Sequence, residues 1–537
     1  MKENIIIDDD ILSNNEKMFY FSESNLIPDN TKEDFKMKQN FLFVFVNPKS
    51  GSHQGANVLE YAEKYKIKSI NKYKVISFPI KDEFHNKESN DSSDYSLDAN
   101  NESSRAKFSP LVEFSTIIFS ILDKEDSARG TIFIKKYLSD FPKNKIKILI
   151  AGGDGTVLRV VEDLNKVKIP IDRCIFGAMP FGTGNDLSHS LGFGNECKVD
   201  DIKNFQRVLY TYLIGTPSKI DIWELDIVVN KEEGGIYDVI TNGETIKNDE
   251  NGEKMTDFKK TFANYFSLGF DARVGYQFEQ RRTSSRFCNK LIYGIEAAKR
   301  ILCCKKNYGL TQLLDSFLEG EDDDEKLFIK ENPSLKSDDS TLNDFSDIEE
   351  VKSKSNGDKK ESLIDKRKLI FKTKNGEDNI KNDIVLKGNP VTIICQNIDF
   401  YMGGTQNIWD KSSHMGITKP EVNKEQYQEY KKQVFDHFQR QVYDDKIIEF
   451  FTYENGIELG LERVAPGLAR RVYQGRGPVY LEFKKHPDNT EKKALGKVFL
   501  NCDGEFYRLQ NPVEISVRLN TNICKGQINI LKNEIGF

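Results

Sequence analysis

The chain has 537 residues, 30% of them charged and 38% hydrophobic, a size that allows two or three domains. A formal net charge of −6 gives no overall basic field, which argues against nucleic acid as a partner, and no apolar run approaches the roughly 20 residues of a membrane span. The eight cysteines include no CxxC pair, so neither a disulfide framework nor a zinc module is supported, and we expect a reducing, cytoplasmic compartment.

The first part of the sequence is polar, and we expect a tail over residues 1–39. The segment FLFVFVNPKSG that follows has the pattern of a buried strand ending in a polar, glycine-containing loop. In this loop Asn47, Ser50 and Gly51 offer an amide, a hydroxyl and a backbone N–H to a phosphate or nucleotide. A polar run over residues 85–107 lacks apolar periodicity and is expected to be a disordered insertion.

The stretch ILIAGGDGTVL joins the apolar pattern of a strand buried on both faces to an amphipathic helical stripe. Glycines in its GGDGT turn allow positive φ and let a ligand approach the backbone. The free amides at the start of the helix favour an anion such as phosphate. Asp154 would repel that phosphate unless Mg²⁺ lay between them. The structural alternative is a tight turn in which Asp154 is a cap.

A third motif, IFGAMPFGTGNDLSHSLG, has the same architecture of strand, small-residue loop and helix, with Asp186 at the turn. In an open α/β sheet such loops gather at the carboxyl ends of the strands, where ligands bind. Three loops of this kind in order favour a nucleotide or phosphate site over three unrelated turns.

The sequence pattern changes near residue 221. Before it, short apolar strands alternate with helical patterns, which predicts a parallel α/β sheet. After it, runs such as VTIICQN, KIIEFFTY, PVYLEFKK and VEISVRL predict a β-rich second domain. Two further polar segments, 231–257 and 315–389, lack apolar periodicity and are expected to be disordered insertions.

The motifs NPKSG, GGDGT and PFGTGNDLS, in this order, resemble the diacylglycerol kinase catalytic domain. The segments NYFSLGFDARVGYQFE, CQNIDFYMGGTQNIWD, QGRGPVYLEF and NCDGEFY resemble the accessory domain of that family. The resemblance implies a Rossmann-like, ATP-binding catalytic domain with a parallel sheet over 40–221, and a β-rich, sandwich-like accessory domain over 222–537. The sequence departs from the family at Met402, where a further glycine is usual.

The resemblance implies an enzyme that transfers a phosphoryl group from Mg-ATP to the free hydroxyl of diacylglycerol. The products are phosphatidic acid and ADP, and the enzyme works as a peripheral protein at a membrane surface. One alternative is a related kinase with a similar turn, acting on a sphingoid base, ceramide or NAD. Another is a catalytically silent lipid-binding scaffold, against which the intact acids of GGDGT and CDGE argue.

The same resemblance assigns residues to roles. The nucleotide pocket would be formed by Asn47, Ser50, Gly51, Gly152, Gly153, Gly155, Thr156, Gly182, Thr183 and Asn185. Asp154, Asp186 and Asp221 would organise Mg²⁺, directly or through water. The structural alternatives are a helix N-cap for Asp186 and a surface or domain-junction acid for Asp221.

Phosphoryl transfer also needs a base that accepts the hydroxyl proton. The resemblance points to Asp503 in CDGE, with Glu505 nearby and Asp154 in the same catalytic group. The alternative is a hairpin turn, because Asp-Gly is a strong turn pair, and both roles are compatible. If Asp503 is the base, the second domain must fold back so that CDGE faces GGDGT.

Overall fold

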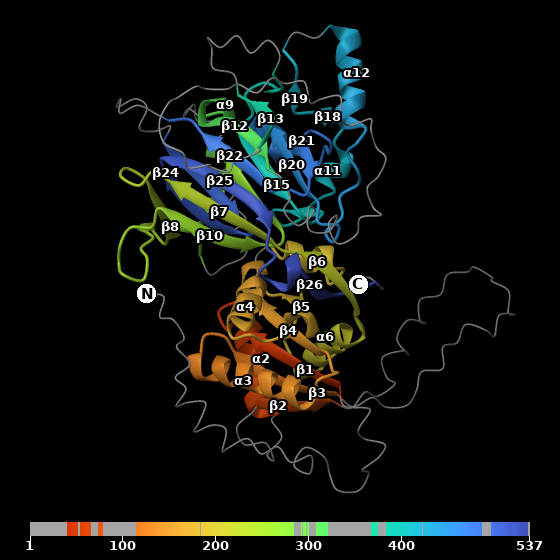
Figure 1. Cartoon of the computed structure of the whole chain (residues 1–537). Coiled ribbons are helices and arrows are strands. Elements are labelled where there is room, and N and C mark those ends of the chain that lie inside the picture. The colour runs from red at the N-terminus through yellow and green to blue at the C-terminus, as the bar shows by residue number, and fades with distance from the viewer. Residues whose placement is uncertain are drawn as a thin grey trace, which may run out of the picture.

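The computed structural model describes residues 40–51, 54–65, 74–78, 114–182, 184–283, 292, 294–296, 298–299, 308–320, 367–373, 383–420, 423–485 and 496–534. Within these ranges, no helix is long and apolar enough to cross a membrane. The expected tail over 1–39, the expected insertion at 85–107 and Thr183 lie outside the described residues. Figure 1 shows the described residues in two bodies, with an α/β body below and a β-rich body above.

The lower body is built on a sheet that has seven strands among the described residues, in the order β2-β3-β1-β4-β5-β26-β6. Neighbouring strands from β3 to β26 run parallel, and the two outer strands β2 and β6 are antiparallel to their neighbours. The bounds are β1 (Asn40–Val46), β2 (Lys74–Phe78), β3 (Phe114–Ser120), β4 (Ile146–Gly152), β5 (Cys174–Pro180), β6 (Thr216–Asp221) and β26 (Gln527–Lys532). The expected parallel sheet is therefore confirmed.

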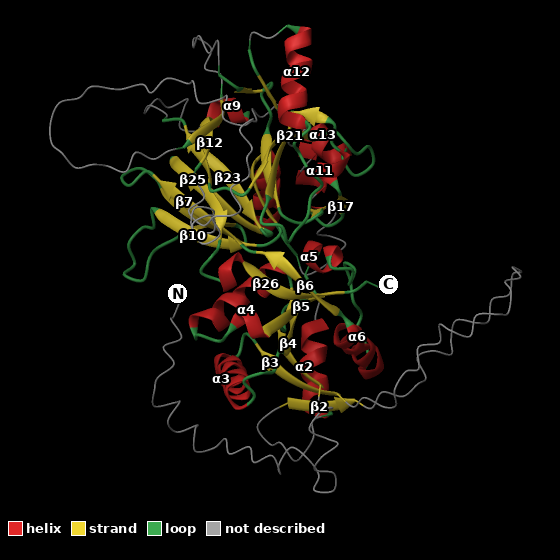
Figure 2. Cartoon of the chain, turned by 45° about the vertical axis from the view of Figure 1, so that its right-hand side comes forward, coloured by secondary structure: helices red, strands yellow, loops and turns green. Residues whose placement is uncertain are grey.

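Helices cover both faces of this sheet, which explains why the sequence of β5 is buried along its whole length. In Figure 2, α3 and α4 lie on one side of the sheet and α2 and α6 on the other. On α4 the apolar stripe Val157, Leu158, Val161 and Leu164 is buried. The bounds are α2 (Gln54–Lys64), α3 (Lys124–Asp140), α4 (Asp154–Lys166), α5 (Asp186–Ser190) and α6 (Ile202–Ile214).

The last strand, β26, corrects the expected division of the chain at residue 221. This strand lies between β5 and β6 in the N-terminal sheet, although the sequence analysis places residues 222–537 in the second domain. Its Ile528, Ile530 and Leu531 are buried in the core of the lower body. The burial alternation of a strand indicates that one face is covered, but it does not indicate which sheet the strand joins.

The upper body is β-rich, as expected. One sheet has the order β10-β7-β25-β22-β12-β13-β14-β19 and another the order β18-β21-β20-β15-β11-β23-β24-β8-β9. One hydrophobic cluster takes buried side chains from both sheets, such as Leu225 and Leu481 from the first and Phe266 and Leu500 from the second.

The bounds in the first of these sheets are β7 (Trp223–Val229), β10 (Asp257–Phe262), β12 (Leu314–Glu319), β13 (Lys368–Lys372), β14 (Val385–Leu386), β19 (Ile417–Thr418), β22 (Val479–Phe483) and β25 (Pro512–Leu519). Those in the second are β8 (Gly235–Ile240), β9 (Gly243–Ile246), β11 (Tyr265–Gly269), β15 (Thr392–Gln396), β18 (His414–Met415), β20 (Ile448–Tyr453), β21 (Arg470–Gly475), β23 (Lys497–Cys502) and β24 (Glu505–Gln510). The remaining elements are β16 (Phe400–Tyr401), β17 (Thr405–Gln406), α7 (Phe270–Gln280), α9 (Leu310–Leu313), α11 (Ile408–Lys411), α12 (Lys424–Phe435) and α13 (Gly456–Leu461).

The expectation of a disordered insertion over 231–257 is wrong. These residues contain β8 and β9, a hairpin whose β8 pairs with β24. The turn between the two strands includes Asn242, which has a φ of 63°, followed by Gly243. The two loop residues are Thr241 and Asn242, because Ile240 already pairs with Gly243. Asparagine tolerates positive φ, so Asn242 is a turn signal that the sequence contains.

The expected insertion over 315–389 is also wrong at both of its ends, where β12, β13 and β14 form part of a sheet. Phe317 of β12 and Phe371 of β13 are fully buried, and their rings stack with centroids 5.2 Å apart. Burial of these aromatic side chains stabilises strands that are flanked by charged sequence. The middle of the segment, residues 321–366 and 374–382, lies outside the described residues.

The two bodies are packed against each other. Ala263, Ile398 and Phe400 of the upper body belong to the hydrophobic core of the lower one, and the rings of His189 and Phe400 stack with centroids 3.9 Å apart. The junction therefore holds residues of the two bodies at fixed positions relative to each other.

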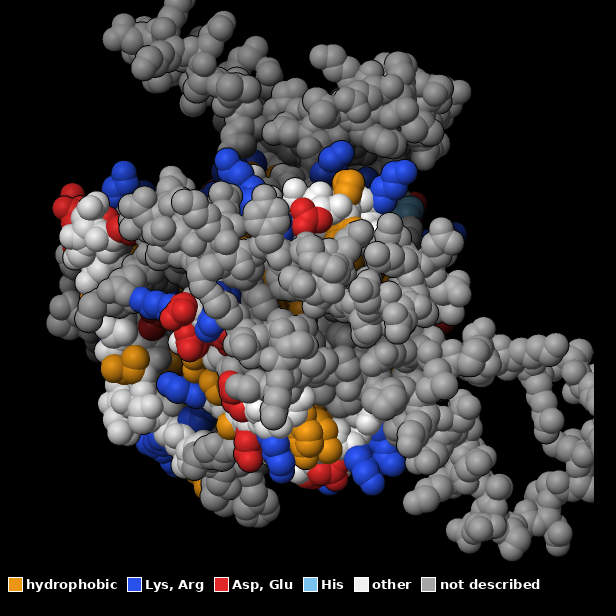
Figure 3. Space-filling model, turned by 90° about the horizontal axis from the view of Figure 1, so that it is seen from below, with side chains coloured by type: hydrophobic (Ala, Val, Ile, Leu, Met, Phe, Trp, Pro, Cys, Tyr) orange, Lys and Arg blue, Asp and Glu red, His pale blue; other side chains and the backbone are white. Residues whose placement is uncertain are grey.

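Seen from below, the described surface of the lower body carries interspersed Lys or Arg and Asp or Glu side chains (Figure 3).

Candidate active site

The three predicted loops meet at the carboxyl ends of β1, β4 and β5. Backbone hydrogen bonds join them, from Asn47 N to Ala151 O at 2.9 Å and from Phe181 N to Gly152 O at 3.2 Å. A Cβ added to Gly182 would stand 2.7 Å from the Cα of Gly153, so these two loops touch through their backbones. Only glycine at position 182 allows this approach, because any side chain would separate the loops.

The residues of the GGDGT turn take the positions that the sequence predicts, with α4 beginning at Asp154 after an extended Gly153. The side chain of Thr156 lies against Gly152, where an added Cβ would be 2.7 Å from the Thr156 Cβ. Backbone amides at the start of α4 precede the first turn of hydrogen bonds and are suited to bind an anion.

The polar side chains of the other two loops hold these loops in place. The Asn47 carboxamide oxygen accepts a hydrogen bond from Lys49 N at 3.1 Å, and Gly51 has a φ of 69°. The Asn185 side-chain N–H groups donate to Gly182 O at 3.0 Å and Asn195 O at 2.7 Å. The side chains of Asn47 and Asn185 thus support the backbones of their own loops.

Two aspartates from neighbouring loops come together. Asp186 N donates to Asp154 Oδ2 at 2.9 Å. The Asp186 carboxylate is buried, and both of its oxygens accept from Gly403 N, at 2.9 and 3.0 Å, while Oδ2 also accepts from Tyr265 OH at 3.0 Å. These partners come from the upper body, and the N-cap of α5 is Asn185. Asp186 therefore joins the two bodies and does not act as the side-chain cap that the sequence left open.

The CDGE turn faces the GGDGT turn. A Cβ added to Gly155 would lie 3.1 Å from Glu505 Oε1 and 3.9 Å from the backbone oxygen of Asp503. Asp503 and Gly504, with φ values of 48° and 78°, connect β23 to β24. The hairpin alternative is thus correct as a description of the backbone, and the hairpin carries both carboxylates to the junction.

Asp503 is buried and held by backbone amides. Its carboxylate accepts from Ala263 N at 2.9 Å, Asn264 N at 3.1 Å and Tyr265 N at 3.0 Å. Burial raises the pKa of Asp503 to about 6, although these three hydrogen bonds act in the opposite direction. The group is therefore a carboxylate of fixed orientation whose pKa lies closer to neutrality than that of an exposed aspartate.

Glu505 has a different environment. It accepts from Lys260 Nζ at 3.0 Å and from Tyr507 OH at 2.6 Å. Burial alone would raise the pKa of Glu505, but the charge of Lys260 and these hydrogen bonds hold it below its ordinary value. Glu505 is thus ionised and paired beside the GGDGT turn.

Asp221 is not brought to this cluster. Its carboxylate accepts from Lys446 N at 2.6 Å and from Gln527 Nε2 at 2.7 Å, while its backbone N–H donates to Tyr443 O at 2.8 Å. Burial raises the pKa of Asp221 to about 7. The side chain joins β6 to β26 and to the loop before β20, which is the junction role that the sequence analysis gave as the alternative.

The chain's own carboxylates provide a limited site for a metal. Among the described residues, no group of three or more His, Cys, Asp or Glu side chains is arranged to hold a metal ion. Asp186 and Asp503 are buried with N–H or O–H donors on their oxygens, whereas Asp154 is partly exposed. Burial of its carboxylate, with Asp186 and Asp503 nearby, raises the pKa of Asp154 to about 8. This donor set fits a magnesium ion held by one carboxylate and by phosphate oxygens.

Two family models match the chain, one in each of its two bodies. The family model for the diacylglycerol kinase catalytic domain matches residues 41–210, and that for the diacylglycerol kinase accessory domain matches residues 261–506. Together these matches span about three quarters of the chain. The chain belongs to the diacylglycerol kinase family.

Individual members of the family match in part. Diacylglycerol kinase 7 of Arabidopsis thaliana is 33% identical over 170 residues, which are 28% of this chain and 34% of that protein. Diacylglycerol kinase 5 of the same plant is 25% identical over 412 residues, 72% of this chain and 65% of that protein. Diacylglycerol kinase zeta of Homo sapiens is 30% identical over 158 residues, 28% of this chain and 15% of that protein. The matched part of the chain thus spans about a third of the length of the first of these relatives.

The upper body supplies further residues to the site, which the sequence motifs do not indicate. The Asn264 side-chain N–H donates to Asp154 Oδ2 at 3.0 Å, Tyr265 and Gly403 contact Asp186, and Lys260 pairs with Glu505. A signal for Asn264 exists in the sequence, because an amide side chain before the apolar strand YFSLG must find partners when it is buried.

A second layer of hydrogen bonds fixes Tyr265. The buried carboxylate of Asp271 accepts from the hydroxyls of Ser267, Thr392 and Tyr401. The Tyr401 ring packs on that of Tyr265, with centroids 4.6 Å apart. Asp271 thereby holds Tyr401, which packs on Tyr265. The hydroxyl of Tyr265 in turn donates to Asp186.

Proposed function

We propose that this chain is an ATP-dependent lipid kinase that phosphorylates the free hydroxyl of diacylglycerol to give phosphatidic acid and ADP. The observation that carries the proposal is the contact between the two turns, in which Glu505 and Asp503 of one body lie beside Gly155 of the other. Phosphoryl transfer needs a phosphate cradle, charge neutralisation and a proton acceptor at one place. The family membership and the names of the relatives support the same activity.

The lower body acts as a Rossmann-like nucleotide-binding domain in this proposal. The ATP phosphates lie on the backbone amides of the GGDGT turn and the start of α4, with the Ser50 and Thr156 hydroxyls alongside. Asp154 holds Mg²⁺, which supplies positive charge to the phosphates when bound. Asn264 and Asp186 orient the Asp154 side chain through the loop contacts described above.

The upper body acts as a sandwich-like accessory domain that presents the lipid. Asp503 accepts the proton of the lipid hydroxyl. At the same time the lipid hydroxyl oxygen forms a bond to the γ-phosphorus of ATP, and the bond from that phosphorus to ADP breaks. Each oxygen of a carboxylate has two lone pairs, so the three backbone donors leave capacity for this proton. Glu505 keeps Lys260 beside the developing charge. The protein meets its substrate as a cytoplasmic, peripheral membrane protein.

A radiolabelled-ATP assay of the purified protein against diacylglycerol, sphingosine and ceramide tests the proposal. We expect label in phosphatidic acid and dependence of this label on added Mg²⁺. Faster labelling of sphingosine or ceramide would replace the substrate, and the absence of any labelled lipid would favour the scaffold alternative. Asp154→Asn, which removes the charge and keeps the size, is the matched control for contaminating kinases.

A further inference from the structure

An exposed apolar segment lies on the accessory domain at α13 and the loop after it. Ile457, Leu461 and Val464 are 54%, 45% and 76% exposed, and their spacing places them on one side of the chain. The opposite side carries Leu459 and Leu468, which pack against the cluster of Phe451 and Tyr453. Three exposed apolar side chains grouped on one side differ from singly scattered ones and form a surface suited to contact another molecule.

The structure holds this segment in place with a buried carboxylate. Glu462 is 2% exposed and accepts from the backbone N–H groups of Gly467, Leu468 and Ala469 at 2.6, 3.0 and 3.2 Å. At the other end of the helix, the Asn455 side chain accepts from Ile457 N and Glu458 N. Val464 is therefore presented on a supported turn and not on a loose loop.

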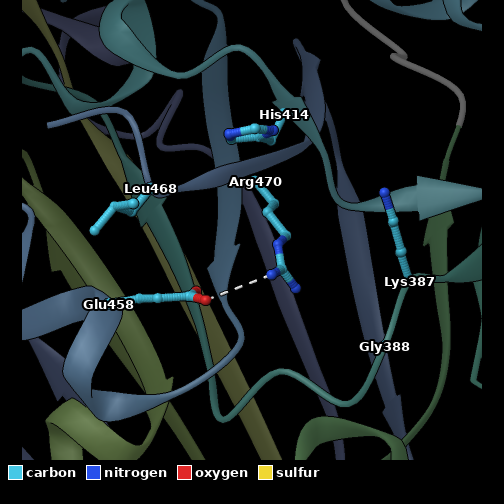
Figure 4. A pocket seen from close by; sticks show the side chains of 6 residues that line it. All are labelled: Lys387, Gly388, His414, Glu458, Leu468 and Arg470. Atoms are coloured by element: carbon cyan, nitrogen blue, oxygen red, sulfur yellow. Dashed lines mark ion pairs between the residues drawn. The ribbon is translucent and has the colours of Figure 1, made fainter.

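The charges of the segment are arranged unevenly. Its two acids are turned away from solvent or paired, because Glu462 is buried and Glu458 forms an ion pair with Arg470 at 3.5 Å. Figure 4 shows this pair beside a cavity of about 410 Å³, which is also lined by Lys387, His414 and Leu468. Arg463, by contrast, is exposed between Leu461 and Val464. The exposed part of the segment thus carries three apolar side chains and one positive charge, a combination that complements an anionic lipid surface.

The segment is continuous with the candidate active site. A Cβ added to Gly404 would lie 3.3 Å from Arg463 Nη2, so the guanidinium of Arg463 lies beside this loop. The neighbouring Gly403 N donates to Asp186. Figure 2 shows α13 and β17 along the same side of the β-rich body, with α5 below them. A surface that this segment touches therefore lies next to the loop that closes over Asp186.

We propose that Ile457, Leu461, Arg463 and Val464, which we call the apolar tip, insert into the surface of a bilayer that contains anionic lipid. This inference rests on the proposed function, because it assigns the place where the site meets its lipid substrate. The three apolar side chains enter the acyl boundary, and Arg463 stays at the level of the anionic headgroups. The tip then brings diacylglycerol to the junction by way of the Gly403–Gly404 loop.

The test measures binding of the full chain to sedimented vesicles of phosphatidylcholine with phosphatidylserine, and to vesicles of phosphatidylcholine alone. Val464→Asp is the main variant, and Ile240→Asp is the matched control, because Ile240 is 48% exposed at the β8–β9 hairpin of the same body. We expect Val464→Asp to lower the bound-to-free ratio about tenfold, from the lost burial of one side chain, and Ile240→Asp to leave it unchanged. Arg463→Gln should lower binding to the anionic vesicles more than to the neutral ones.

A second measurement separates this inference from the proposed function. Turnover of a short-chain diacylglycerol dissolved as monomers should be the same for Val464→Asp and the wild type, whereas turnover of diacylglycerol in anionic vesicles should fall. If the wild type does not phosphorylate the monomeric short-chain diacylglycerol, the proposed kinase function is overturned, whereas the vesicle-binding result still stands. Equal vesicle binding by Val464→Asp and wild type overturns the tip assignment. Sedimentation without vesicles gives the particle mass of each protein. If Val464→Asp has half the mass of the wild type and the same vesicle binding, the tip contacts a second copy of the chain, and this result also overturns the membrane assignment.

Discussion

The side-chain amide of Asn264 donates a hydrogen bond of 3.0 Å to Asp154 Oδ2, and so joins two residues that are 110 positions apart. Because Asn264 is 1% exposed and belongs to the β-rich body, it sets the position of the Asp154 carboxylate from outside the GGDGT turn. The same residue gives its backbone N–H to Asp503. One residue thus fixes the relative positions of the two carboxylates assigned to metal binding and to proton transfer.

We expect Asn264→Ala to lower turnover by roughly tenfold or more, because a misplaced catalytic group costs orders of magnitude in rate. The affinity for ATP should change little, since the backbone amides of the phosphate loop remain. Steady-state kinetics with varied ATP measures both quantities. Asn165→Ala is the matched control, because that side chain bonds to Asn522 O at the surface. Wild-type turnover in Asn264→Ala would show that the loop alone positions Asp154.

Asp503→Asn should lower turnover by roughly 10²-fold or more, because it removes the proton acceptor while keeping the size of the side chain. The melting temperature should also fall, since the new amide N–H group must face one of the three backbone donors that hold Asp503. Calorimetric titration with ATP should give an affinity close to that of the wild type. Full turnover at neutral pH in this variant would mean that the base lies elsewhere.

Asp221 provides a pH-dependent test of its junction role. Its pKa is raised by burial to about 7 from an ordinary value of 3.8, so the folded state binds the proton more tightly than the unfolded chain. The contribution of Asp221 to the free energy of unfolding is therefore fully present below pH about 4 and is lost as the pH rises through about 7. Asp444 and Asp445, which lie nearby, act in the same direction.

The measurement compares the wild type with Asp221→Asn in urea at pH 5 and pH 8. Between these two pH values the variant should gain about 3 kcal/mol of stability relative to the wild type, because the folded wild type loses its tightly bound proton over this range. The Mg²⁺ concentration that gives half-maximal activity should be the same for both proteins. A shift of that concentration by more than about tenfold would instead place Asp221 in the metal site, in line with the resemblance.

Deletion of 315–387 tests whether the ends of this charged segment are structural. It removes most of β12 and all of β13 and β14, including the stacked pair Phe317 and Phe371, from the centre of one sheet. We expect the deleted protein to lose its cooperative thermal transition, measured by circular dichroism. The control deletion 324–363 keeps all three strands, and longer loops add little closure entropy. A cooperative transition in both deletions would contradict the structural role of β12 and β13.

Much of the lower body could be predicted because its signals are local. The apolar run of β4, the glycines after it and the stripe of α4 lie within 20 residues, and steric and periodic rules act over that range. The shared edge of a parallel sheet then predicts that the three loops meet. The hairpin within 231–257 also has a local signal in Asn242, but the polar composition of this segment predicts disorder.

The order of the motifs and the chemistry of the loops were thus determined by the sequence alone. Only the tertiary structure decided that β26 returns to the first sheet, that Asp221 lies at the junction, and that Asn264 and Gly403 reach Asp154 and Asp186. The reason is physical. A strand or a buried amide specifies what kind of partner it needs, through its pattern of burial and its unpaired N–H and C=O groups. Which of many chemically equivalent partners it meets depends on how the whole chain packs.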